Sequence, residues 1–202
     1  MLKVGLTGSI AVGKSFVCDI FRELGAFILD ADITAREVVA PETKGLKTIV
    51  ETFGAEILQA NGELDRIKLG AIVFGDEAKR QLLNSIVHPL VIEAQNKWMR
   101  EHEAADAICI VDAALMIESG SYLRFDRLIV VWCEFAIQLQ RLMLRNTLTE
   151  TEALKRIDAQ MPQAEKKQFA DFLIDTSEGF EATRRQTTEI FKQLKSLAEG
   201  SS

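Results

Sequence analysis

Hydrophobic and polar positions follow two patterns along this chain. Short apolar runs occur near residues 2–6, 26–30, 107–112, 128–133 and 172–175. Largely apolar runs of this length are typical of strands that are buried on both faces of a sheet. The longer segments between most of them carry apolar residues at helical spacing. This alternation predicts an α/β fold, with a parallel sheet of five strands and helices on both faces.

The long segment after the second apolar run has no strand pattern. Between Thr34 and Glu103 the spacing predicts helices over residues 33–39, 45–58, 77–87 and 90–103. Because proline disfavours helical geometry at the residue before it, we expect a break at His88–Pro89. A helical excursion of this length, residues 34–103, predicts a subdomain that covers an acceptor substrate.

The stretch Gly8–Ser15 reads G-x-x-x-x-G-K-S between the first strand and the first helix. In this setting, backbone N–H groups and a helix N-terminus cradle nucleotide phosphates, and glycine tolerates the positive φ that the turn needs. We expect Lys14 to reach the β- and γ-phosphates of ATP and the Ser15 hydroxyl to ligate Mg²⁺. The predicted nucleotide-binding residues are Gly8, Ala11, Val12, Gly13, Lys14, Ser15 and Phe16. An incidental glycine-rich turn is the alternative, and the strand-to-helix setting argues against it.

Two carboxylates, Asp30 and Asp32, follow the second predicted strand. Ligands of open α/β sheets lie beyond the C-terminal ends of strands, so these side chains are expected near the phosphate site. If the strand continues, both point the same way. One could then accept the proton of an attacking hydroxyl and either could help to hold Mg²⁺, or one could cap the helix that begins near Ile33. We expect one Asp to act in chemistry and the other as the cap.

Other charged residues fit phosphoryl transfer. Asp112 ends the third predicted strand, where a metal-binding carboxylate and a simple loop residue are equally good interpretations. Arg141 and Arg145 are four residues apart and share a helix face. They could clamp a phosphoryl group or simply face solvent, and their place after the fourth strand favours a lid over residues 136–164. The remaining residues, 1–33, 104–135 and 165–202, are expected to form the core of a single domain.

Composition narrows the classes of function. The net charge of −6 argues against general nucleic-acid binding, and no apolar run is long enough for a membrane span. No leader pattern is visible at the N-terminus, so a cytoplasmic protein is expected. The cysteines Cys18, Cys109 and Cys133 are interpreted as small buried side chains in a reducing compartment. With only two histidines, a zinc site is not expected.

Two other classes of function fit the sequence less well. A GTPase switch would need an Asn-Lys-x-Asp motif, and Asn96–Met99 lacks its final Asp. A non-catalytic nucleotide-binding module would not need Lys14, Ser15, Asp32 and a pair of lid arginines, all of which are present.

The sequence resembles the dephospho-CoA kinases from Lys3 to about Leu194. The resemblance is carried by the phosphate loop, by Asp30-Ala31-Asp32 with its following helix, by two central segments and by the lid region. The matching stretches are Val4–Ser15, Asp30–Val39, Gly62–Arg66, Leu83–Pro89, Leu115–Gly120, Gln138 to Arg145, Ala159-Gln160, Lys166 and Ala170-Asp171. Nucleoside, nucleotide and shikimate kinases share the phosphate loop and lid, but are not expected to carry Asp-Ala-Asp-x-x-Ala-Arg together with His-Pro.

The resemblance implies a three-layer P-loop NTPase fold and transfer of the ATP γ-phosphate to the 3′-hydroxyl of dephospho-CoA, the last step of coenzyme A synthesis. It implies that Asp32 is the base and that Arg141 and Arg145 are lid arginines. It also implies that the acceptor is bound by Asp30, Arg36, His88 and Glu118. The small molecule dephospho-CoA is the expected partner, with neither nucleic acid nor membrane, and the protein is expected to be a monomer or a small homo-oligomer.

Some positions depart from the family pattern. Ser9 and Ala11 stand where glycine is commoner, and both can serve if their φ values are negative. Ala114 replaces a usual proline, which could loosen the loop that carries Glu118. Thr176 replaces a usual asparagine, which could weaken substrate contacts.

Overall fold

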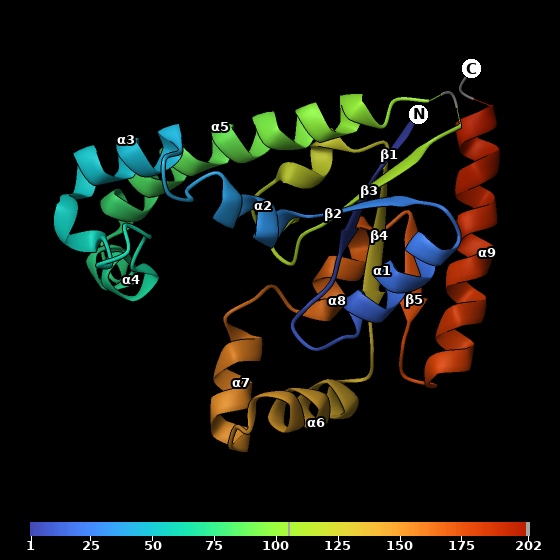
Figure 1. The fold of residues 1–202 in the computed structure, drawn as a ribbon. Coiled ribbons are helices and arrows are strands. Elements are labelled where there is room, and N and C mark those ends of the chain that lie inside the picture. Colours follow the sequence, from blue (N-terminus) through green and yellow to red (C-terminus); the bar gives the residue numbers. More distant parts are fainter. Residues whose placement is uncertain (105, 201–202) are drawn as a thin grey trace. The chain divides into compact units, whose positions relative to one another are not determined.

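The fold is built on a parallel sheet (Figure 1). The computed structural model describes residues 1–104 and 106–200. Within these residues the sheet has five strands in the order β2-β3-β1-β4-β5, all parallel. The strands are β1 Leu2–Thr7, β2 Phe27–Asp30, β3 Ile108–Asp112, β4 Arg127–Trp132 and β5 Phe172–Asp175. The predicted α/β fold and all five predicted strands are confirmed, with small shifts at their ends.

The chain divides into two compact units. The sheet unit comprises Met1–Asp30 and His102–Ser202, and the helical unit comprises Ala31–Glu101. None of the described helices is long and apolar enough to cross a membrane.

One face of the sheet is covered by α1 (Lys14–Glu23) and α9 (Phe180–Glu199), which pack against each other (Figure 1). Alternate residues of β1, among them Val4 and Leu6, are fully buried in the core on that side. The opposite face meets the segment after β3, where a β-carbon at Gly5 would lie 2.6 Å from the Met116 sulfur. Both faces of the central strand are therefore buried for most of its length, as its largely apolar run predicts.

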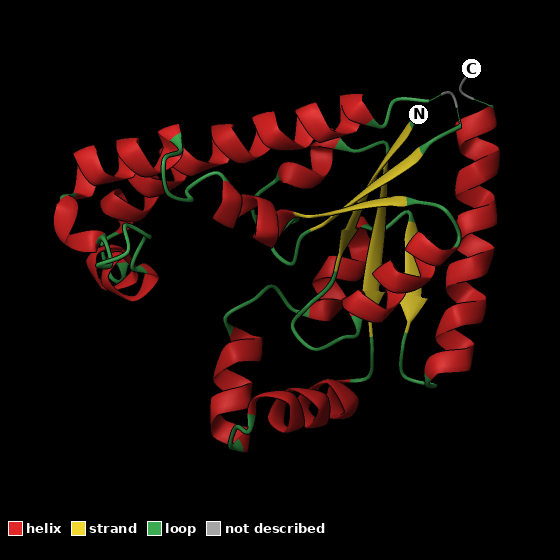
Figure 2. Cartoon of the chain, in the orientation of Figure 1, coloured by secondary structure: helices red, strands yellow, loops and turns green. Residues whose placement is uncertain are grey.

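The rest of the sheet unit is made of short helices (Figure 2). They are η2 Ser121–Arg124, α6 Phe135–Asn146, α7 Glu150–Asp158, α8 Gln163–Lys166 and η3 Lys167–Phe169. The α6–α7 pair occupies the segment predicted as a lid. Thr149 and Glu152 form a reciprocal capping box that fixes the start of α7.

The helical unit contains α2 Ala31–Glu37, α3 Lys44–Phe53, η1 Ala55–Ile57, α4 Arg66–Val73 and α5 Glu77–Glu101. Its own apolar core includes Ile49 and Ile57, both fully buried. No strand was predicted from 34 to 103, and none occurs there among residues that the structure describes. The helix predicted over residues 45–58 ends earlier, at Phe53, because Gly54 takes a φ of 91°.

The break predicted at His88–Pro89 is wrong. Helix α5 continues through Pro89 and spans 25 residues. Proline in a helix interior removes one backbone hydrogen bond and crowds the preceding turn. The helix persists because α2, α3 and α4 all pack along it, and this packing outweighs the local cost.

Candidate active site

The phosphate loop joins β1 to α1 and is shaped by two glycines. A β-carbon at Gly8 would lie 2.3 Å from the Val131 carbonyl oxygen, so only glycine fits against β4 there. Gly13 takes a left-handed conformation, φ 92°, and is the N-cap of α1. It carries no capping side chain, so the N–H groups of the first turn remain available to an anion.

Ala11 does not meet the condition of a negative φ. Its φ is 62°, in the left-handed region that favours glycine. Such a conformation costs a non-glycine residue of order 1–2 kcal/mol and persists only where its surroundings hold it. The backbone path of the loop, rather than the residue's own preference, decides the conformation of Ala11.

Carboxylates end two neighbouring strands beside this loop. Asp30 of β2 and Asp112 of β3 are paired in register. The Lys14 ammonium lies 3.8 Å from an Asp112 carboxylate oxygen, and both side chains are largely buried. The Cys18 thiol donates to the other Asp112 oxygen at 3.6 Å. Burial, aided by the Asp112 charge, raises the pKa of the Cys18 thiol well above its ordinary value, so the thiol stays protonated.

The second carboxylate after β2 belongs to the helical unit. The strand ends at Asp30 and α2 begins at Ala31, so the extended geometry that would align Asp30 with Asp32 does not occur. Asp32 lies instead in the first turn of α2, where the helix dipole favours a negative charge. Arg36 follows it by four residues, both are exposed, and the spacing gives them one helix face. His88 is exposed on α5.

The two predicted lid arginines differ in their surroundings. Arg141 donates to the side chain and the carbonyl of Thr176, both at 2.8 Å. The Thr176 hydroxyl donates in turn to the Val12 carbonyl at 2.7 Å. Thr176, which replaces the asparagine usual at this position, therefore joins Arg141 to the phosphate loop. Arg145 is exposed and bonds to Asn146.

Glu118 is held by a buried lysine. The Lys166 ammonium, which is completely buried, lies 2.8 Å from a Glu118 carboxylate oxygen and donates to the Ala114 carbonyl at 2.8 Å. The same Glu118 oxygen accepts the Met161 N–H at 3.1 Å. The Ala114 carbonyl also accepts a hydrogen bond from the Thr7 hydroxyl. The loop that lacks the usual proline is therefore held in place by two hydrogen bonds to this carbonyl.

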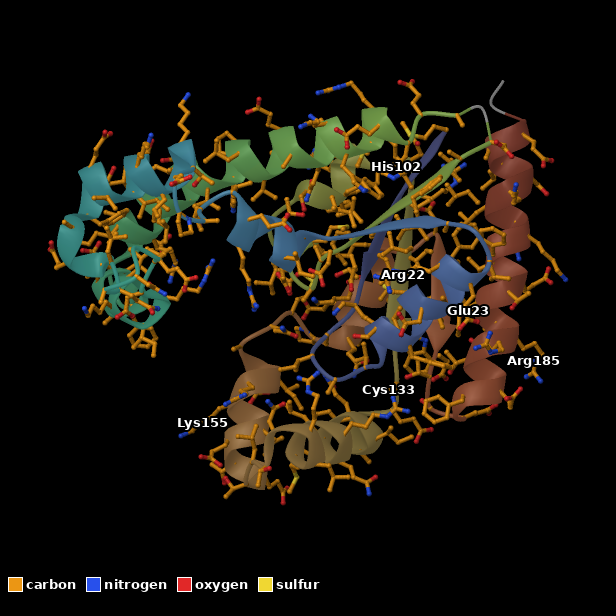
Figure 3. The ribbon with its side chains drawn as sticks, viewed as in Figure 1. Arg22, Glu23, His102, Cys133, Lys155 and Arg185 are labelled. Atoms are coloured by element: carbon orange, nitrogen blue, oxygen red, sulfur yellow. The ribbon has the colours of Figure 1, made fainter. Side chains whose placement is uncertain are left out.

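Glutamine side chains connect the α6–α7 region to the tip of the phosphate loop. Gln138 donates to the Ile10 carbonyl at 2.8 Å, and Gln160 accepts the Ile10 N–H at 2.8 Å. Gln163 donates to Gln138 at 2.6 Å and accepts the N–H of Cys133, which is labelled in Figure 3, at 3.1 Å. The side chains of Gln138, Gln160 and Gln163 are together called the glutamine chain below.

The sequence by itself indicates no role for Lys166, Gln160, Gln163 or the contacts of Thr176. One signal was available for Gln138, which is spaced four residues from the buried Leu142 and so places an amide on the apolar face of α6. A polar residue in such a position needs a buried partner. The partners are distant in sequence, and no local pattern identifies them.

The donor set near the loop fits Mg²⁺. Among the described residues, no group of three or more His, Cys, Asp and Glu side chains could hold a metal ion by itself. Kinases bind Mg²⁺ through one or two protein oxygens together with the substrate phosphates, so such a group is not required. The Ser15 hydroxyl at the start of α1 and the Asp112 carboxylate at the end of β3 are oxygen donors of the required kind.

The chain is similar over most of its length to dephospho-CoA kinases. The family model described as dephospho-CoA kinase matches residues 2–181. A dephospho-CoA kinase from Geobacillus kaustophilus is 48% identical over 200 residues, covering 97% of this chain and 98% of the relative. The crystal structure of TT1252 from Thermus thermophilus is 26% identical, with a TM-score of 0.84 and coverage of 95% and 96%. The dephospho-CoA kinase from Campylobacter jejuni is 26% identical, with a TM-score of 0.72 and coverage of 99% and 98%.

Proposed function

The chain belongs to the dephospho-CoA kinase family, and on that premise we propose that it transfers the γ-phosphate of ATP to the 3′-hydroxyl of dephospho-CoA, giving coenzyme A. The observation that carries this conclusion is the family match, which extends over residues 2–181 and so includes the phosphate loop and both lid arginines. The roles of individual residues are part of the proposal.

The nucleotide is bound by the phosphate loop. The triphosphate lies against the N–H groups of residues Ala11 to Phe16 and the positive end of α1. Lys14 adds a point charge near the β- and γ-phosphates. The support is geometric, because Gly13 leaves the first turn of α1 without a side-chain cap.

Magnesium accompanies the nucleotide in this proposal. Ser15 and Asp112 would hold the ion, and Asp30, in register with Asp112, is the neighbouring carboxylate. When bound, Mg²⁺ supplies positive charge to the phosphate oxygens. The choice rests on the oxygen donors described above.

Asp32 is the proposed base. The 3′-hydroxyl oxygen forms a bond to the γ-phosphorus, the bond from that phosphorus to the bridging β–γ oxygen breaks, and ADP leaves. The hydroxyl proton goes to the Asp32 carboxylate. Lys14, Arg141 and Arg145 balance charge on the moving phosphoryl group, while the lid excludes water. The exposure of Asp32 supports this role, since a base must meet its substrate.

The acceptor is bound by Asp30, Arg36, His88 and Glu118. Arg36 supports this assignment because it shares an exposed face of α2 with Asp32. Glu118 is placed by its contacts with Lys166 and Met161, so its position does not depend on substrate. We further propose a cytoplasmic protein that is a monomer or a small homo-oligomer. The free, buried cysteines fit a reducing compartment.

The variants Asp32→Asn and Lys14→Ala test these roles. We expect Asp32→Asn to lower kcat by about 10²–10⁴ while ATP binding is kept, because only the proton acceptor is lost. Lys14→Ala should lower kcat by about 10²–10³ and weaken ATP binding as well. Formation of coenzyme A is measured by mass spectrometry and ATP binding by calorimetry.

Arg22→Ala is a suitable control, since Arg22 is exposed on α1 and bonds to Asp19 rather than to the loop. It should leave turnover within about twofold, as expected for a surface ion pair. Near-normal turnover by Asp32→Asn would remove its assignment as base. A native chain that forms no coenzyme A would contradict the function itself.

A further inference from the structure

The tip of the phosphate loop is held by side chains from outside the loop. We propose that Gln138 and Gln160 are positioning residues. They keep the loop in its nucleotide-binding conformation by hydrogen bonding to the N–H and the carbonyl of Ile10. The proposal rests on the nucleotide-binding part of the proposed function and not on the identity of the acceptor.

Both backbone groups of Ile10 form hydrogen bonds with glutamine side chains. Its N–H donates to the Gln160 carbonyl oxygen, and its carbonyl accepts from the Gln138 amide nitrogen, each at 2.8 Å. Gln138 is completely buried, and Gln160 is partly buried. An unmade hydrogen bond at a buried polar group is costly, so these contacts hold Ile10 more firmly than equivalent contacts on the surface would.

The backbone groups at the two ends fix the direction of the glutamine chain. The Ile10 carbonyl can only accept, so Gln138 must present its NH₂ there and its oxygen to Gln163. Gln163 then donates its NH₂ to Gln138 and presents its oxygen to the Cys133 N–H, a backbone donor. Each amide has one orientation that satisfies its neighbours, so the loop tip is joined to the end of β4 by bonds of defined polarity.

The residue that needs this support is the next one in the chain. Ala11, with a φ of 62°, occupies a conformation that alanine adopts reluctantly and glycine readily. Without the two hydrogen bonds to Ile10, Ala11 would populate other backbone conformations for much of the time. The apparent affinity for nucleotide would then be lower, in proportion to the fraction of molecules whose loop keeps the nucleotide-binding conformation.

The supporting residues come from both ends of the predicted lid. Gln138 lies in the first turn of α6, and Gln160 follows the end of α7 by two residues. Gln163 begins α8 and completes the connection. The segment that carries Arg141 and Arg145 is therefore attached at each end to the loop that binds the phosphates.

The test is a cycle of two substitutions, Gln160→Met and Ala11→Gly. Methionine keeps the approximate size of glutamine but cannot accept the Ile10 N–H. We expect Gln160→Met to raise the Kd for ATP with Mg²⁺ by about fivefold, which corresponds to the net contribution of one hydrogen bond. The kcat at saturating ATP should change by less than about twofold. In the Ala11→Gly background the same substitution should raise Kd by less than about twofold, because glycine needs no support at that position.

The controls separate positioning from general damage. Gln193→Met, at an exposed glutamine of α9, should leave the Kd unchanged. Thermal unfolding of each variant checks that it is folded. An equal rise in Kd in both backgrounds, or no rise in either, would overturn the positioning role. Absence of ATP binding by the native chain would instead contradict the nucleotide site itself.

Discussion

At the residue scale, the candidate site depends on polar atoms whose partners are far away in the sequence. Thr176 joins Arg141 to Val12, and Lys166 joins Glu118 to Ala114. Each of these contacts satisfies a group that would be costly to leave without a partner in the interior. The identity of the residue at 176 matters through its hydroxyl, which both donates and accepts there.

Cys18 gives a prediction about pH. In the unfolded chain its thiol ionises with a pKa of about 8.5. In the folded protein burial and Asp112 raise the pKa, so above about pH 8.5 the unfolded chain binds fewer protons and stability falls as pH rises. We expect the free energy of unfolding of the native chain to fall relative to that of Cys18→Ala by up to about 1.4 kcal/mol per pH unit.

The measurement is urea unfolding of both proteins at pH 7.5 and pH 9.5. Alanine removes buried atoms at either pH, so that constant cost cancels when the two differences are compared. A difference between native chain and variant that does not change with pH would show that the thiol ionises normally in the folded state.

At the element scale, α5 shows how packing overrides a local signal. Pro89 predicts a break, yet the helix continues because three helices pack along it. Replacing Pro89 with alanine should therefore raise the stability of the helical unit. We expect the free energy of unfolding to rise by about 1–2 kcal/mol. This is less than the full penalty of proline in a helix, because alanine also raises the conformational entropy of the unfolded chain.

Urea unfolding followed by circular dichroism measures this gain. Asn84→Ala, at an exposed position of the same helix, is the matched control and should gain no more than about 0.5 kcal/mol. If Pro89→Ala is less stable than the native chain, proline fits α5 better than its missing hydrogen bond suggests.

The elements that the sequence predicts well are those with local causes. The strands follow from short apolar runs, and the turn at Gly13 follows from a motif whose residues are adjacent. The contacts of the glutamine chain with the loop have no such cause, because Gln138 and Gln160 lie 128 and 150 residues from Ile10 and meet it only once the sheet has formed. The left-handed Ala11 belongs to the same class, since its conformation is imposed by neighbours.

At the scale of the whole molecule, the two units contribute different chemistry to the proposed reaction. The sheet unit carries the phosphate loop, Asp112 and the lid arginines, whereas the helical unit carries Asp32, Arg36 and His88. In the proposed function, the nucleotide is bound by residues of the sheet unit. The proposed acceptor-binding residues are divided between the units, because Asp30 and Glu118 belong to the sheet unit and Arg36 and His88 belong to the helical unit.

The identity of the acceptor decides the proposed function, and a comparison of acceptors tests it most directly. Purified protein with ATP and Mg²⁺ is offered dephospho-CoA, adenosine, AMP or shikimate, and ADP release is followed with the product identified by mass. We predict ADP release with dephospho-CoA alone, in equal amount to a product with the mass of coenzyme A. Turnover of another acceptor in preference to dephospho-CoA, or ATP binding without turnover of any of them, would contradict the claim.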